Sequence, residues 1–101
     1  MENDFTFMKK SVKQIQDLNI SDYNPRQIRR EDFEQLKESI KKFGFVEPVV
    51  VNIHPERPNH IVGGHQRVKA AAELGYEELE CVEVNLDKEQ ERELLIRLNR
   101  N

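Results

Sequence analysis

A pair of glycines followed by polar and basic residues is the segment whose residue types best suit chemistry. It reads Gly63-Gly64-His65-Gln66-Arg67 and leads into a run of three alanines. Glycines let the backbone approach a ligand closely, and the first turn of a helix offers unpaired N–H groups and a positive dipole end. Arg67 adds a fork for two phosphate oxygens, and His65 and Gln66 add donors. The segment indicates a phosphate site; the alternative is a tight strand-to-helix turn with a solvated Arg67.

Two other charged positions could serve such a site. Arg26 follows Asn24-Pro25, and a proline stiffens a loop that could aim the arginine at a pocket. Glu47 lies between Gly44 and an apolar, β-branched run, where its carboxylate could hold Mg²⁺ or act as a base. For both positions the alternative is a solvent-exposed loop residue, which the residues alone favour.

Metal clusters and activated nucleophiles find no support in the sequence. His54, His60 and His65 are spread over an expected hairpin and helix start, so they would face different ways. The single cysteine, Cys81, stands in an apolar run, where a free cysteine is usually a small buried hydrophobe. No GxSxG, HExxH or Walker A pattern occurs. The sequence therefore shows no complete catalytic constellation.

Composition narrows the class of protein further. The chain has 101 residues, 35% of them charged, and a net charge of −3, which predicts one compact domain and argues against a strongly basic nucleic-acid binder. One cysteine excludes an intramolecular disulfide and indicates an intracellular, cytoplasmic setting. The sequence has neither an apolar run of roughly 20 residues for a membrane span nor a secretory signal. We expect a single domain over residues 1–101, with its core at about residues 8–98.

The first half of the chain contains patterns for one strand and one helix. A loose alternation predicts a short strand within residues 8–15, and polar residues with a proline predict a loop over residues 19–26. Apolar residues at spacings of three and four, from Phe33 to Phe43, predict one helix with a single apolar stripe. Gly44 would end this helix.

The second half predicts a hairpin, two helices and a further strand. Residues 48–53 are nearly all apolar and β-branched, as in a central strand buried on both faces, and residues 60–62 would return beside it. A helix over residues 65–74 and a strand over residues 80–85 follow. A third helix would begin after Asp87, which forms a capping-box pattern with the glutamine three residues later. This order predicts an α+β fold, a small mixed sheet flanked by about three helices.

Taken together and in this order, the motifs resemble a known family. The matching elements are Asn24-Pro25-Arg26, Phe33-x-x-Leu36-x-x-Ser39-Ile40 with Gly44, Pro48-Val49-Val50-Val51, and Gly63-Gly64-His65-Gln66-Arg67 with Ala70, Ala71, Leu74 and Gly75. The chain resembles the ParB-like N-terminal domain, also called the ParB-like nuclease domain, of the ParB/sulfiredoxin superfamily. It is most similar to the version that precedes phage and prophage DNA methyltransferases. Residues 98–101 resemble the junction into such an enzyme, which implies the N-terminal part of a longer protein.

The resemblance implies a site for a nucleoside triphosphate, CTP or ATP, together with Mg²⁺. Carried over by position, the phosphate-binding residues would be Gly63, Gly64, His65, Gln66, Arg67, Arg26 and Asn24. The segment Gly44-x-x-Glu47-Pro48 matches the family's Gly-x-x-Gln-Pro, which lies beside the nucleotide. Glu47 would be the candidate metal ligand and catalytic group.

The sequence departs from the family's pattern at three places. Glu47 replaces the usual glutamine, which bears on recognition of the base. His65 stands where sulfiredoxin has its catalytic cysteine, which argues against reduction of sulfinic acids. Residues 95–99 lack the acid of the Glu-Asn pair that partition proteins use for hydrolysis, so efficient CTP cleavage is not expected. We also expect no partition-type helix-turn-helix within these 101 residues.

Three functions stay open at this point. The first is a nucleotide-binding module with weak or no turnover, serving a DNA-modification or DNA-partition protein that reaches DNA through a larger assembly. The second is a metal-dependent nuclease or a phosphotransferase, although Glu47 has no second carboxylate at a suitable spacing. The third is a non-catalytic domain that forms a homodimer or docks a methyltransferase. None of the three involves a membrane.

Overall fold

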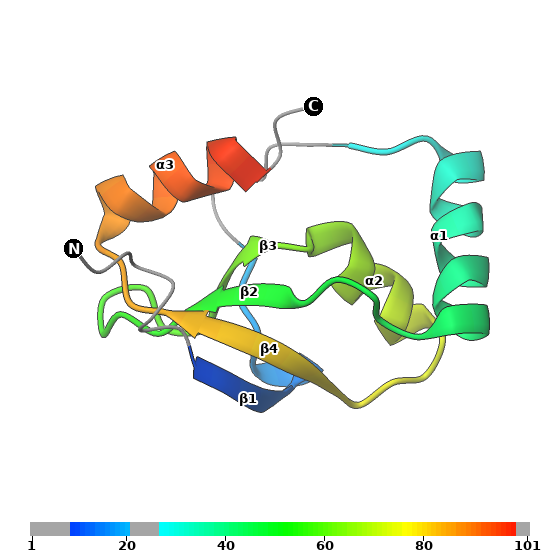
Figure 1. Ribbon diagram of the computed structural model, residues 1–101, viewed down its shortest axis with the longest axis horizontal. Helices are drawn as coiled ribbons and strands as arrows, with labels where there is room; N and C mark the ends of the chain where they lie inside the picture. The colour runs from blue at the N-terminus through cyan, green and yellow to red at the C-terminus, as the bar shows by residue number, and fades with distance from the viewer. Residues whose placement is uncertain (1–8, 21–26, 99–101) are drawn as a thin grey trace.

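The structure, a computed structural model of the chain, describes residues 9–20 and 27–98 (Figure 1). The strands are β1 (Lys9–Gln14), β2 (Val49–Asn52), β3 (His60–Gly63) and β4 (Glu78–Val84). The helices are α1 (Arg30–Phe43), α2 (His65–Glu73) and α3 (Lys88–Leu98), and a 3-10 turn, η2 (Ile15–Asp17), follows β1. Within the described residues this is the predicted α+β arrangement, a small mixed sheet with three helices.

Strand β2 lies inside the sheet, as its apolar run predicts. The strand order is β1-β4-β2-β3, with β2 parallel to β4 and the other two pairs antiparallel. Val49 and Val51 of β2 are completely buried. The β2–β3 pair is the predicted hairpin. Strand β4 begins at Glu78, before the predicted start, because Gln14 of β1 pairs with it there.

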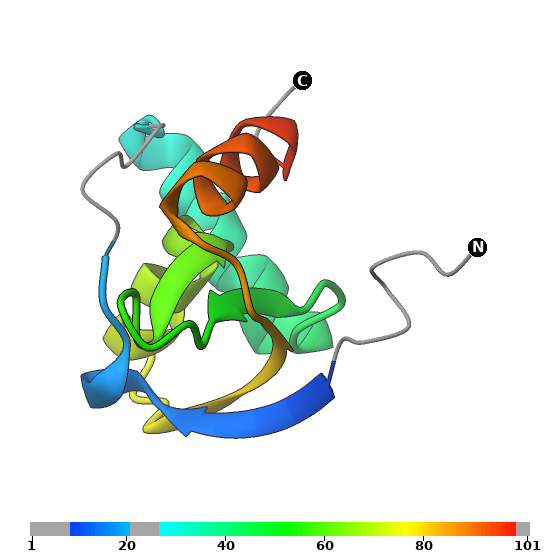
Figure 2. The same cartoon turned by 90° about the vertical axis from the view of Figure 1, so that its left-hand side faces the viewer.

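Alternation along the strands divides the core between two faces of the sheet. The cluster toward α2 contains Val49, Val51, Ile61, Val68, Ala71, Leu79 and Cys81. The cluster toward α3 contains Val62, Val84 and Leu95, with Val50 packed against it. Figures 1 and 2 show α3 and β1 on opposite sides of the molecule, above and below β2 and β4. The sheet is therefore covered on both sides, which accounts for the apolar character of β2.

Helix α1 stands outside α2, away from the strands (Figure 1). Its charges suit the helix dipole, with acids in the first turn and bases in the last: Glu31, Asp32, Lys41 and Lys42. Gly44 ends the helix as predicted. Its φ is 76°, and its N–H donates to the carbonyl of Ile40 over 2.8 Å.

The apolar stripe of α1 differs from the predicted one at its end. The spacing assigns Phe43 to the buried stripe, but its side chain is 66% exposed. The chain turns at Gly44, and Phe45 packs against the core instead, with its ring edge-on to Tyr76 at 5.6 Å between centroids. The turn thus replaces one aromatic residue by another at the core.

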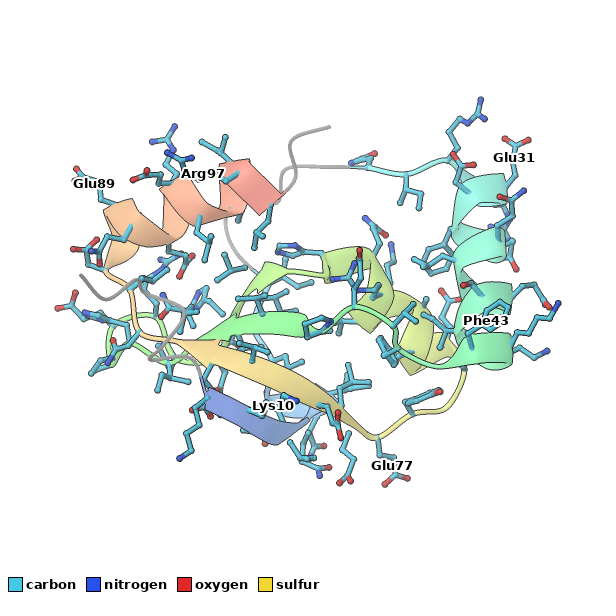
Figure 3. All side chains as sticks on the ribbon, viewed as in Figure 1. Lys10, Glu31, Phe43, Glu77, Glu89 and Arg97 are labelled. Atoms are coloured by element: carbon cyan, nitrogen blue, oxygen red, sulfur yellow. The ribbon has the colours of Figure 1, made fainter. Side chains whose placement is uncertain are left out.

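Helix α3 begins with the predicted capping box. The N–H of Gln90 donates to Oδ1 of Asp87 over 2.8 Å, and the N–H of Asp87 donates to Oε1 of Gln90 over 3.0 Å. Leu95 is buried against the sheet, whereas Arg97 projects away from the strands (Figure 3). Among the described helices, none has the length and apolar content needed to cross a membrane.

Candidate functional site

The glycine pair joins the edge strand β3 to the start of α2. Gly63 is the last residue of β3, and Gly64 is the N-cap of α2, with φ 99° and ψ 23°. The first N–H to bond within the helix is that of Val68, which donates to the Gly64 carbonyl over 2.9 Å. The N–H groups before it stand at the end of the helix that carries the positive dipole. This is the strand–turn–helix geometry that the sequence predicts for a phosphate site.

Each of the two glycines leaves room for a neighbouring side chain. A Cβ atom on Gly64 would come within 2.9 Å of Nη2 of Arg67 and 3.3 Å of Cγ2 of Val49. A Cβ atom on Gly63 would come within 2.9 Å of Cδ1 of Leu98, at the end of α3. Gly64 is therefore required both for its left-handed backbone and for the place of the Arg67 guanidinium. The absence of a Cβ on Gly63 leaves the space that the end of the Leu98 side chain occupies.

The guanidinium of Arg67 lies across Gly64 and is held from its other side by the loop before β2. Nη1 donates to Oε1 of Glu47 over 3.1 Å, and Nη2 donates to the carbonyl of Pro48 over 3.1 Å. The Nε atom is buried and has no hydrogen-bond partner among the described residues. These two hydrogen bonds hold the Arg67 side chain in place. The side chain is 25% exposed, so part of its charge lies at the surface.

His65 and Gln66 differ in how they face the first turn of α2. The Nε2 atom of His65 is buried and lacks a hydrogen-bond partner in the part of the chain that the structure describes. Burial lowers the pKa of His65 below its usual value near 6.5, and the Ile61 backbone and the Glu91 carboxylate oppose this shift only in part. A contact from His65 to an anion would thus come from its backbone N–H rather than from its ring. Gln66 lines an open hollow instead.

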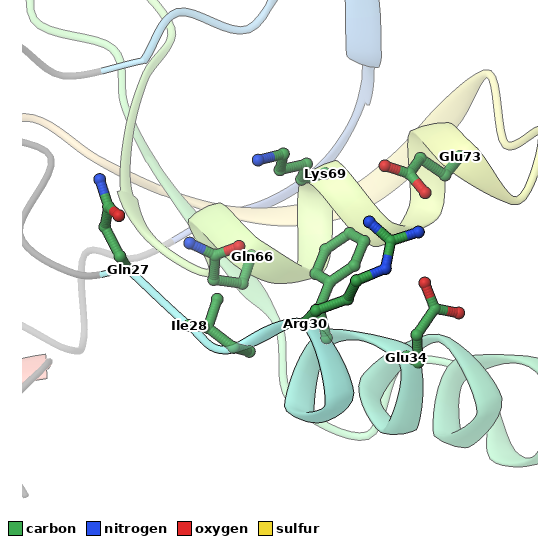
Figure 4. Close-up of a pocket in the computed structure, with 8 residues that line it drawn as sticks. Gln27, Ile28, Arg30, Glu34, Gln66, Lys69 and Glu73 are labelled. Carbon is green, nitrogen blue, oxygen red and sulfur yellow. The ribbon is translucent and has the colours of Figure 1, made fainter.

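The hollow lies between α1 and α2 and has a volume of about 410 Å³ (Figure 4). Basic and acidic side chains are both present among its lining residues, which are Gln27, Ile28, Arg30, Phe33, Glu34, Gln66, Lys69 and Glu73. Nζ of Lys69 lies 5.8 Å from the centre of the Phe33 ring. The hollow borders the glycine turn through Gln66, and its size is within the range of small-molecule pockets.

Two of the predicted site residues, Asn24 and Arg26, lie outside the described residues. Within the described ranges, no group of three or more histidine, cysteine and acidic side chains is placed to hold a metal ion. The carboxylate of Glu47 is 74% exposed and is paired with Arg67. Its roles as metal ligand and catalytic group stay predictions. Cys81 is buried in the core, as expected, and burial raises the pKa of its thiol.

A buried polar cluster, which the sequence patterns did not predict, ties α3 to the hairpin. Glu91 has no exposed surface, and its Oε2 accepts a hydrogen bond from Nη2 of Arg57 over 2.9 Å. Nδ2 of Asn52 donates to Oε1 of Glu91 over 2.7 Å. Burial alone raises the pKa of Glu91, but the hydrogen bonds from Arg57 and Asn52 outweigh it and hold the pKa below the usual value near 4.5. The sequence feature that points to this cluster is Asn52, a polar residue at the end of an apolar strand.

Comparison with known proteins gives these features a family context. The sequence model described as the ParB N-terminal domain matches residues 2–100. A nucleoid occlusion protein of Bacillus cereus is 29% identical over 78% of this chain and 29% of its own length. The chromosome-partitioning protein ParB of Caulobacter crescentus, complexed with CTP-gamma-S, is 28% identical with a TM-score of 0.80, over 91% of this chain and 53% of that one.

The chain thus spans about a third of that curated relative and about half of the crystallised one. Sulfiredoxin from Arabidopsis thaliana, at 20% identity and a TM-score of 0.70, covers 86% of this chain and 97% of its own and shares the fold alone. Because the family's sequence model matches nearly all of its residues, this chain belongs to the ParB N-terminal domain family.

Proposed function

We propose that this domain binds a nucleoside triphosphate, with the phosphates on the segment from Gly63 to Arg67. The observation that carries the proposal is the guanidinium of Arg67, which lies across Gly64 at the start of α2 in a space that a Cβ atom would fill. The Caulobacter relative complexed with CTP-gamma-S supports the proposal and makes CTP the first candidate, with ATP as the alternative.

The chain's own groups suit a polyphosphate in three ways. The first-turn N–H groups of α2 would donate to phosphate oxygens, and the positive end of the helix dipole would favour their charge. Arg67 would add charged hydrogen bonds, since its position is already fixed by Pro48 and Gly64. A bound Mg²⁺ would neutralise part of the phosphate charge, and Glu47 is its predicted protein ligand. Arg26 and Asn24 stay candidates for further phosphate contacts.

The domain would serve a larger protein that partitions or modifies DNA. The supporting observation is that relatives are named as a nucleoid occlusion protein and as chromosome-partitioning proteins, and are longer than this chain. A Caulobacter ParB structure is complexed to the centromeric parS site. We infer that the domain reaches DNA through a longer protein. We also propose, as in the sequence analysis, that this longer protein is linked to a DNA methyltransferase and that the domain forms a homodimer.

The test is direct binding of CTP, ATP and GTP, each with and without Mg²⁺, measured by calorimetry on the purified domain. We expect one of the triphosphates to bind, and Arg67→Ala to weaken that binding about tenfold or more, because charged hydrogen bonds to the phosphates are lost. Thermal midpoints would give a second readout, since a ligand that binds the folded state raises them.

Arg97→Ala is the matched control. Arg97 is 65% exposed on α3 and is paired with Glu93 over 3.1 Å, so this variant removes the same charge without touching the glycine turn. Unchanged affinity in Arg97→Ala together with lost affinity in Arg67→Ala supports the phosphate site. Equal affinity in wild type and Arg67→Ala would contradict it.

A further inference from the structure

We propose that Glu47 is a built-in competitor of the bound phosphate for Arg67, and that it sets how strongly nucleotide binding depends on magnesium. The inference rests on the proposed phosphate site and deepens it, and it assigns Glu47 a role different from the predicted one of a metal ligand. Its starting point is the 3.1 Å contact from Nη1 of Arg67 to Oε1 of Glu47, which joins two segments twenty residues apart in the chain.

Nη1 is the nitrogen atom of the Arg67 guanidinium that can most readily change its hydrogen-bond partner. Nη2 donates inward to the Pro48 carbonyl and lies over Gly64, and Nε is buried. Glu47 is 74% exposed, whereas Arg67 is 25% exposed, so the carboxylate approaches the guanidinium from the solvent side. A phosphate that reaches Arg67 from solvent must therefore share or displace this carboxylate.

The exposure of Glu47 determines what kind of competitor it is. An ion pair with so exposed a carboxylate is weak, so a phosphate can displace it at little cost. The carboxylate remains tethered nearby, however, and repels a multiply charged phosphate chain. Glu47 thus weakens binding of the bare anion without closing the site.

Magnesium changes this balance in a way that can be measured. A magnesium-bound triphosphate carries less negative charge, so its repulsion from Glu47 is smaller. We expect Glu47→Gln to raise the affinity for metal-free CTP about fivefold and the affinity for magnesium-bound CTP by about twofold or less. Glutamine has nearly the shape of glutamate and can still accept a hydrogen bond from Arg67, so the loop keeps its place.

The experiment titrates CTP into four proteins, in EDTA and in excess Mg²⁺: wild type, Glu47→Gln, Glu38→Gln and Arg67→Ala. Should another triphosphate be the one that binds, it replaces CTP throughout. Glu38→Gln is the matched control, because Glu38 is 76% exposed on α1 and is paired with Lys41 over 3.9 Å. It removes the same charge from the chain at a position that does not line the hollow. Thermal midpoints of the ligand-free variants check that each is folded.

The outcomes distinguish a failure of the inference about Glu47 from a failure of the proposed nucleotide binding. A gain in CTP affinity in Glu47→Gln that is larger in EDTA than in Mg²⁺, and absent in Glu38→Gln, supports the role of Glu47 as a competitor. Weaker binding of magnesium-bound CTP in Glu47→Gln would make Glu47 a metal ligand and overturn the competitor. No change in Glu47→Gln while Arg67→Ala loses binding would overturn only the competitor. An Arg67→Ala affinity equal to wild type would overturn the phosphate site, and the competitor with it.

Discussion

Arg57, in the turn between β2 and β3, holds the fully buried carboxylate of Glu91 in α3, with 2.9 Å between Nη2 and Oε2. Asn52 completes the contact by donating to Oε1 of the same carboxylate. The three side chains lie on β2, in the hairpin turn and on α3, so they connect the hairpin to a helix that follows more than thirty residues later in the chain. The cluster thus joins the first half of α3 to the hairpin, and the last residue of the helix, Leu98, lies beside Gly63.

Arg57→Ala is expected to destabilise the domain by about 3 kcal/mol, because it leaves the Glu91 charge buried and without its main partner. Urea unfolding would measure the loss. Arg97→Ala is again the control, since its pair with Glu93 is exposed on both sides and should change stability by about 0.5 kcal/mol or less. Equal small effects of the two substitutions would show that the Arg57–Glu91 contact does not hold α3.

Gly64→Ala is expected to abolish nucleotide binding and to lower stability by about 2 kcal/mol. The left-handed φ of 99° is strained for alanine, and the new Cβ would displace Nη2 of Arg67. Gly75→Ala separates the two causes, because Gly75 has φ 93° but no atom within 4 Å of the place that a Cβ would occupy. It should lower stability through the backbone alone, by about 1 kcal/mol, and leave CTP affinity intact. Calorimetric titration and urea unfolding of both variants would measure these effects.

The buried His65 ring is expected to make stability fall as the solution becomes mildly acidic. Because burial lowers the pKa of His65 in the folded state, the unfolded chain binds more protons once the pH drops below about 6.5. The contribution of His65 to the free energy of unfolding is then fully present above pH 6.5, and it declines as the pH falls toward the pKa of the folded state. Unfolding midpoints measured from pH 7.5 to pH 5 should show this decline.

His65→Gln supplies the comparison for that pH series, because glutamine keeps a polar side chain but does not titrate in this range. Its stability should change less between pH 7.5 and pH 5 than that of the wild type. Chemical shifts of the His65 ring would measure the pKa directly. A normal or raised pKa by this method would contradict the burial argument.

Local signals in the sequence predicted most of the elements that hold the candidate site. The capping box at Asp87 and the glycine after α1 act within one helical turn, so neighbouring residues suffice to recognise them. The apolar run of β2 predicted a central strand because only a strand covered on both faces tolerates it. The glycine pair predicted the turn into α2 for the same local reason.

Contacts between distant segments were not predictable in the same way. The pairing of Glu47 with Arg67 and the burial of Glu91 beside Arg57 join residues twenty and thirty-four positions apart. Neither has a characteristic spacing, and a charged residue in a polar stretch is usually solvent-exposed. The exchange of Phe43 for Phe45 in the core likewise depends on where the turn at Gly44 directs the chain.

The order of the elements and the glycine turn before α2 could be predicted from the sequence, because they follow from backbone preferences and periodicity along the chain. The family resemblance came from the matching motifs and their order. The place of the Arg67 guanidinium over Gly64 and beside Glu47, and the burial of the His65 ring nitrogen, became known only from the folded chain. These features depend on tertiary contacts because the ionisation and solvation of a side chain are set by its neighbours in space. Strand pairing and helix packing bring those neighbours together from separate parts of the chain.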